Sequence, residues 1–210
     1  MVSDVREAIL VVLLAVGGAV TYGVANDQFT AHLAPQYFTI GHVDHLHVNT
    51  PFLLAFEWGY LGTWWVGLAL GIPAALIARL GWGEKVPVAW FAPRLTGLFV
   101  AMALAAAATW IVTYFLASAN IVDVAAVVRP GVVPAQRLAY YADWAANVAS
   151  YAVGGCGALG LLAWAGWRRL HPAAMPADRP WLRAVRRGLS AVGTISLALA
   201  GALVFSGRMP

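Results

Sequence analysis

A short histidine-rich segment contains the side chains best suited to chemistry in this sequence. His42, His45 and His47 are separated by three and two positions, and Asp44 lies among them. Residues two apart project to the same side of an extended segment, and residues three apart share a helical face, so either conformation pairs two imidazoles. Neutral imidazole binds Zn, Cu, Fe or Ni, and a neighbouring carboxylate is a further ligand or orients an imidazole. The spacing predicts a divalent transition-metal site for Cu or Zn; the alternative is a loop that binds such ions loosely without using them.

Glu57 is the one charged residue in an apolar run that begins at Pro51 and continues almost to Arg79. Inside a membrane a carboxylate costs several kcal/mol unless it is protonated, paired or facing a watery cavity. At helical spacing Glu57, Tyr60 and Trp64 share one face, so we expect the Tyr60 hydroxyl to hydrogen-bond the carboxyl group. Glu57 is then a metal ligand or proton acceptor, or it is a protonated carboxyl satisfied by neighbouring helices.

A polar stripe runs along a later apolar segment at helical periodicity. Its members are Tyr140, Asp143, Asn147, Ser150 and Tyr151. A stripe of this length faces protein or water and not lipid. Hydrogen bonding between helices accounts for Asn147 and Ser150. It accounts poorly for Asp143, because Ser or Asn gives similar hydrogen bonds without the desolvation cost of a carboxylate.

The composition shows what kind of elements must position these residues. The chain has 210 residues, of which 61% are hydrophobic and only 10% charged, and its mean hydropathy is +0.75. Soluble domains carry roughly a quarter charged residues, so a soluble globular protein is excluded, and nucleic-acid binding with it. The single cysteine, Cys156, excludes an internal disulfide and a Cys-based metal site.

The uncharged stretches predict an all-α, polytopic integral membrane helical bundle of five transmembrane helices in a single domain, 1–210. Each stretch is about as long as the 20 residues that a helix needs to cross a hydrocarbon core of about 30 Å. The predicted spans are 8–26, 51–80, 95–118, 139–167 and 189–206.

The basic residues predict the orientation of these spans. Ten of them share one side of the membrane: Arg6, Arg79, Lys85, Arg94, Arg168, Arg169, Arg179, Arg183, Arg186 and Arg187. Arg129, Arg137 and Arg208 are left for the other side. The positive-inside rule then places the N-terminus inside and the C-terminus outside, with external loops 27–50 and 119–138. The basic loop 168–188 is cytoplasmic and is expected to contact anionic lipid, in the inner membrane of a bacterium.

These spans bring the polar residues to one depth. The second and fourth spans both run inward from the outer face, so Glu57 and Asp143 are expected at similar levels below the histidine loop. The third span brings Tyr114 to the same half of the membrane. A single site open to the outside is therefore predicted, lined further by Tyr60, Trp64 and Tyr114.

Two stretches carry a resemblance to a known group. Residues 36–42 read QYFTIGH, and after Pro51 come Trp58-Gly59 and the run 63–73, TWWVGLALGIP. This pattern resembles that of uncharacterised bacterial multi-pass membrane proteins, in which a YFTIGH loop precedes a WG...TWWVGL helix. The resemblance covers about a third of the chain and implies a membrane fold only. His45, His47 and Glu57 depart from the group's pattern, so metal chemistry would belong to this chain and not to the group.

Three functions are compatible with these features. The first is an accessory or structural subunit of a larger membrane complex, which binds other membrane-protein subunits. The second is a metal-binding or redox membrane protein with an externally open His/carboxylate site. The third is a small transporter or proton-coupled channel, although no inverted repeat is visible. The sequence shows no P-loop, HExxH, CxxCH or dinucleotide motif, and it therefore gives no support for an enzyme.

Overall fold

A computed structural model describes residues 2–43, 45–81, 83–171 and 180–205 of the chain. Every regular element in these ranges is helical: α1 (Val2–Leu33), α2 (Pro35–Thr39), α3 (Pro51–Leu61), α4 (Trp64–Arg79), α5 (Val88–Ser118), the 3-10 helix η1 (Pro134–Gln136), α6 (Arg137–Leu170) and α7 (Pro180–Phe205). Within the described residues, four stretches are long and apolar enough to cross a membrane: Ser3–Leu33, Pro51–Arg79, Val88–Ser118 and Pro134–Leu170. The expectation of an all-α chain with several such helices is confirmed.

The predicted external loop 27–50 begins too early in the chain. α1 continues to Leu33, and α2 follows it almost at once. Polar residues that follow the predicted helix end form hydrogen bonds within the helix itself. Thr30 donates to the carbonyl of Asn26 at 3.4 Å, and Nδ1 of His32 donates to the carbonyl of Gln28 at 2.6 Å. Tertiary burial of this polar turn thus overrides its loop-like composition.

The predicted second span, 51–80, is two helices and not one. Thr50 caps α3 by accepting a hydrogen bond from the Leu53 amide at 3.4 Å, and Pro51 occupies the first turn, where a proline is favoured. The helix is interrupted at Gly62 and Thr63, and α4 begins at the next residue. Trp64 therefore does not continue the helix that holds Glu57, and the expected shared face does not form.

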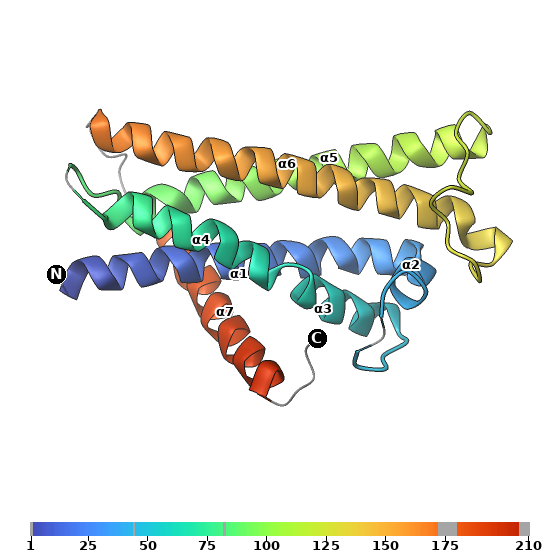
Figure 1. Cartoon of the computed structure of the whole chain (residues 1–210), viewed down its shortest axis with the longest axis horizontal. Helices are drawn as coiled ribbons and strands as arrows, with labels where there is room; N and C mark the ends of the chain where they lie inside the picture. Colours follow the sequence, from blue (N-terminus) through green and yellow to red (C-terminus); the bar gives the residue numbers. More distant parts are fainter. Residues whose placement is uncertain (1, 44, 82, 172–179, 206–210) are drawn as a thin grey trace.

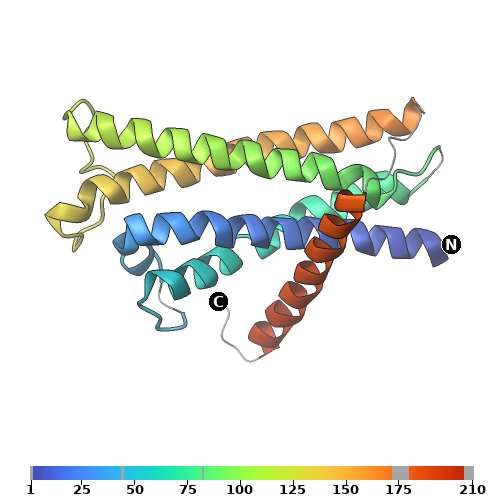
Figure 2. The ribbon, with the colours of Figure 1, turned by 180° about the vertical axis from the view of Figure 1, so that it is seen from behind.

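The last helix, α7, crosses α1 obliquely (Figure 2). It contains most of the predicted fifth span, 189–206, whose final residue lies outside the described part of the chain. The predicted basic loop, 168–188, is helical at both ends, because α6 continues to Leu170 and α7 begins at Pro180; residues 172–179 are not described.

The long helices form two groups. α1 packs closely against α3 and α4 on one side and against α7 on another, while α5 and α6 form an antiparallel pair (Figure 1). Gly67 and Gly71, a small-xxx-small pair, lie directly against the backbone of α1 at Val16 and Val12. The α5–α6 pair meets α1 and α4 less extensively, which leaves space between the two groups.

Charged residues join the segments at the end of the bundle where the chain begins. Arg79 pairs with Asp4, and the guanidinium of Arg168 contacts both carboxylate oxygens of Glu84, at 3.0 and 3.2 Å. Glu7 accepts a hydrogen bond from the amide that begins α5, at 2.9 Å. These contacts bring the N-terminus, the α4–α5 connection and the end of α6 together.

Two packed clusters occupy the ends of the bundle. The larger contains Leu14, Phe91 and Leu161 and lies towards the end with the ion pairs. The smaller contains Ala31, Phe38 and Leu54 and lies towards the opposite end. The middle region between these clusters contains a cavity that both helix groups line.

Candidate functional site

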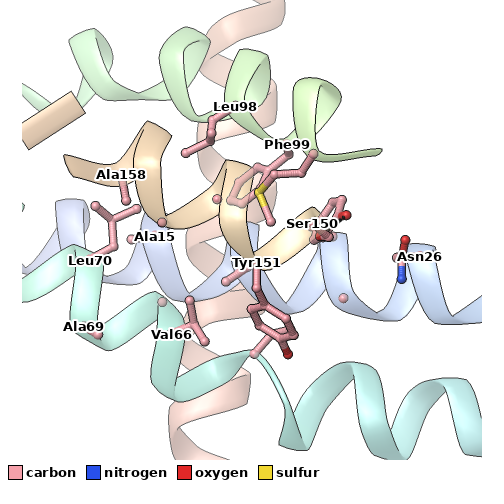
Figure 3. A pocket seen from close by; sticks show the side chains of 18 of the residues that line it. Ala15, Asn26, Val66, Ala69, Leu70, Leu98, Phe99, Ser150, Tyr151 and Ala158 are labelled. Carbon is pink, nitrogen blue, oxygen red and sulfur yellow. Dashed lines mark hydrogen bonds between the residues drawn. The ribbon is translucent and has the colours of Figure 1, made fainter. Parts of the chain in front are cut away.

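A cavity of about 420 Å³ lies in the middle of the bundle, between α1 and α4 on one side and α5 and α6 on the other (Figure 3). Small residues create much of this space. Ala15 and Ala19 of α1 and Ala158 of α6 lie opposite one another where longer side chains would fill the gap. Phe99 and Met102 of α5 form the back wall. The volume falls within the range of about 300 to 1,000 Å³ that is usual for small-molecule sites.

The cavity opens to one side, between α4 and α6. Trp65 and Ala69 line it from α4, and Tyr151 and Leu159 line it from α6; all four are exposed at the surface of the bundle. The Tyr151 hydroxyl donates to the carbonyl of Gly62, at 3.3 Å, and so connects α6 to the break between α3 and α4. The opening is therefore on the long side of the bundle and not at either end.

The two ends of the cavity differ in polarity. Leu70, Leu98 and Leu162 line the end nearer the larger packed cluster. At the other end the lining is polar and includes Tyr22, Asn26, Asp27, Asn147 and Ser150. The Tyr22 hydroxyl and the Ser150 hydroxyl share a 2.6 Å hydrogen bond that joins α1 to α6. The cavity is thus amphipathic along its length.

Two buried carboxyl groups lie at the polar end. Asp27 of α1 lines the cavity and is 7% exposed, and its Oδ1 accepts a hydrogen bond from Asn26 at 3.1 Å. Asp143 of α6 is 0% exposed, and neither of its carboxyl oxygens has a hydrogen-bond partner. The two groups are close enough for their charges to interact, and the Thr30 side chain lies beside both.

Sequence reasoning does not select Asp27, because the first predicted span, 8–26, ends one residue before it. A signal was nevertheless present. Tyr22, Asn26 and Thr30 are four residues apart and continue a polar helical face past the assumed boundary. Of the stripe on α6, Tyr140, Asp143 and Ser150 are buried, and Asn147 and the exposed Tyr151 line the cavity.

His42 lies in an aromatic pocket above the polar end. Its ring is 4.5 Å from the ring of Trp58 and 4.9 Å from that of Tyr37, and its Nδ1 donates to the Tyr37 carbonyl at 3.0 Å. Burial lowers the pKa of His42; the Tyr37 hydrogen bond opposes this shift, and the charge of Arg129 adds to it. Burial also raises the pKa of Tyr37, as does the nearby carboxyl of Asp143. The surroundings of His42 therefore favour the neutral form of its ring.

This burial predicts a pH dependence of stability. The unfolded chain takes up a proton at His42 as the pH falls below about 6.5, while the folded protein resists protonation. The stability contributed by the neutral ring is complete above that pH and is lost as the pH falls from about 6.5 towards the lower folded-state pKa. The His42→Asn variant keeps an N–H donor without titrating, and its unfolding midpoint should fall less between pH 7 and pH 5 than that of the wild type. His32→Asn, at an exposed histidine, is the control; equal pH dependence in wild type and His42→Asn would contradict the prediction.

The predicted metal ligands do not assemble in the described structure. His45 lies 5.6 Å from the ring of Trp58, and Oε1 of Glu57 accepts a hydrogen bond from the Leu46 amide at 3.0 Å. Asp44 is outside the described residues. Among the residues that are described, including His47, no three His, Cys, Asp or Glu side chains form a group able to hold a metal ion. Glu57 instead fixes the backbone of the histidine loop.

Three other predicted lining residues also lie elsewhere. The Tyr60 hydroxyl donates to the carbonyl of Ser196 in α7, at 2.8 Å, and not to Glu57. Tyr114 stacks on Trp110 of its own helix, with ring centres 5.1 Å apart, and it is not part of the cavity lining. Trp65, and not Trp64, lines the cavity, because the helix break changes which face of α4 points inward.

The lining is suited to binding a small molecule. Its polar end presents hydroxyl, amide and carboxyl groups, and its apolar end presents aliphatic side chains. A molecule with both characters would satisfy the whole lining, since polar groups left unpaired in an apolar site are costly. No family model matches the chain, and no curated protein sequence or solved structure matches it either.

Proposed function

We propose that this protein is a multi-pass membrane protein that binds a small amphipathic molecule drawn from the bilayer. The observation that carries the proposal is the amphipathic cavity with its opening between α4 and α6. Both helices belong to segments long and apolar enough to cross a membrane, so the opening faces hydrocarbon and a ligand enters sideways from the lipid.

The depth of the cavity supports this proposal. Its lining on α1 runs from Ala15 to Asp27, roughly 18 Å at 1.5 Å per residue. Asp27 lies six residues, about 9 Å, before the end of the helix at Leu33. The apolar end is thus near the middle of the membrane and the polar end near its surface, which matches the orientation of an amphipathic molecule in a bilayer.

The same geometry favours ligand binding over an accessory subunit of a larger complex. A polar stripe on α6 would need a partner subunit as cover if it faced lipid. Asp143 and Ser150 are instead buried by helices of this chain. Of the three candidate functions, the small transporter is the one most similar to this proposal. The proposed site binds an amphipathic molecule, whereas the expected pathway would carry ions.

For the topology we propose five spans, with the N-terminus inside and the C-terminus outside, in a bacterial inner membrane. Four basic residues gather around the α4–α5 connection, at the end of the bundle where the chain begins: Arg79, Lys85, Arg168 and Arg169. This supports a cytoplasmic position for that end. The basic residues from 168 to 188 would then lie against anionic lipid. The polar end of the cavity would face outward.

Reporter fusions test this topology. A periplasm-active reporter fused after residue 45 should be active, and the same reporter fused after residue 175 should be inactive, because basic segments remain in the cytoplasm. A cytoplasm-active reporter should give the opposite pattern. Activity of the periplasmic reporter at residue 175 would overturn the orientation.

Photolabelling tests the binding site. We expect a C12 alcohol carrying a diazirine, photolysed with the protein in phosphatidylcholine nanodiscs, to label the cavity rim at Trp65 and Leu159. Excess dodecanol should compete with this labelling. Ala158→Phe places a ring in the cavity and should reduce the labelling severalfold, whereas Ala152→Phe, at an exposed position of the same helix outside the lining, should not. Labelling spread evenly over exposed helix faces and unaffected by dodecanol would overturn the proposed function.

A further inference from the structure

We infer that the cavity selects a lipophilic organic cation, whose charge lies at Asp27 and whose apolar groups contact the aromatic lining. This inference rests on the proposed function and names the chemical class of its ligand. It depends on three features of the polar end: the two carboxyl groups, the aromatic side chains near them, and the absence of a basic partner for them among the residues that the structure describes.

The charge around the cavity is complementary to a cation. Within the described part of the chain, Asp27 is the only Asp or Glu in the lining, and no Lys, Arg or His lines the cavity. The second carboxyl group, of Asp143, is not part of the lining but is close enough to interact with the charge of Asp27. Among the described residues, no ion pair joins a basic side chain to either carboxyl. An anionic ligand would meet two acids and no compensating charge.

The burial of these acids strengthens the preference. Two neighbouring carboxyl groups in a low-dielectric interior cannot both be charged at low cost without a positive partner. No well-formed hydrogen bond reaches either carboxyl oxygen of Asp143, and the neutral Thr30 side chain beside it supplies no positive charge. A cation held at Asp27 would provide the missing positive charge, and its effect would be large because water is excluded.

The aromatic residues distinguish an organic cation from a metal ion. Tyr22, Trp58, Trp65, Phe99 and Tyr151 all line the cavity. Tyr22 and Phe99 stack with ring centres 5.8 Å apart. Aromatic faces attract quaternary ammonium and similar cations, which have little hydration to lose. A small metal ion would need several oxygen ligands and would have to cross hydrocarbon to reach the opening.

Two ions of the same shape and opposite charge provide the test. We expect the full-length protein in phosphatidylcholine nanodiscs to bind tetraphenylphosphonium at least tenfold more tightly than tetraphenylborate, after subtraction of the binding to empty nanodiscs. Asp27→Asn should weaken the binding of tetraphenylphosphonium about tenfold or more, and Asp27→Glu should keep most of it. Asp123→Asn changes a carboxylate in an exposed loop outside the cavity lining and should bind as the wild type does.

The diazirine alcohol keeps this inference separate from the proposed function. Competed labelling by the alcohol together with no preference for tetraphenylphosphonium over tetraphenylborate would overturn the inference and leave the proposed function standing. If the wild-type protein showed neither competed labelling by the alcohol nor preferential binding of tetraphenylphosphonium, both the proposed function and the inference would be overturned. If Asp27→Asn also lost its labelling by the alcohol, that variant would be misfolded, and Asp27→Glu would replace it in the test. An Asp27→Glu protein that is labelled by the alcohol but binds tetraphenylphosphonium weakly would contradict the inference. Retained binding of tetraphenylphosphonium by this variant would support it.

Discussion

Gly59→Ala is expected to destabilise the protein, although alanine is ordinarily the better helix residue. A Cβ atom at position 59 would lie 2.5 Å from both the Cα and the N of Val24, and 2.7 Å from the carbonyl carbon of Gly23. All three are backbone atoms of α1, so no side chain can rotate to relieve the contact. The two helices would have to separate, at a cost of about 1 to 3 kcal/mol.

Gly160→Ala is the matched control, because a Cβ atom there has nothing within 4 Å. Alanine is favoured over glycine in a helix by about 1 kcal/mol, so this variant should be neutral or more stable than the wild type. Unfolding by SDS in mixed micelles, followed by circular dichroism, measures both changes. Equal effects in the two variants would show that α3 does not pack on α1 as closely as described.

Asp143→Asn is expected to stabilise the protein by about 1 to 3 kcal/mol, in contrast with most substitutions of a fully buried residue. The carboxyl group of Asp143 has neither exposure nor a hydrogen-bond partner, and it lies beside the carboxyl of Asp27. An amide of nearly the same shape removes the unfavourable interaction between the two acids and most of the desolvation cost.

The double variant tests whether the two carboxyl groups are coupled. Asp27→Asn should stabilise the protein less, because Asp27 already accepts a hydrogen bond from Asn26. The combined variant should be less stable than the sum of the two changes predicts, since either substitution alone relieves the same repulsion. Both variants should be measured by SDS unfolding at one pH and protein concentration. A clear loss of stability in Asp143→Asn would mean that the carboxylate has a stabilising partner.

The site was only partly predictable. The stripe from Tyr140 to Tyr151 was found because helical periodicity is a local property of the sequence. Asp27, its counterpart on α1, was missed because a polar pair at the end of an apolar run is typical of a helix end. The histidine motif predicted metal ligands by their type, but type does not fix geometry: His42 and His45 pack on Trp58, and Glu57 binds a loop amide.

The sequence by itself determined that the chain is helical and apolar enough for several membrane crossings, since hydropathy and helix length depend only on residues near one another in the chain. It did not determine the break between α3 and α4, the burial of Asp27 or the cavity. Those features depend on which helix faces pack together. Close backbone contacts, such as Gly59 on Val24 and Gly67 on Val16, determine that packing. Only the tertiary structure decided them, because such contacts join residues far apart in sequence that leave no local pattern.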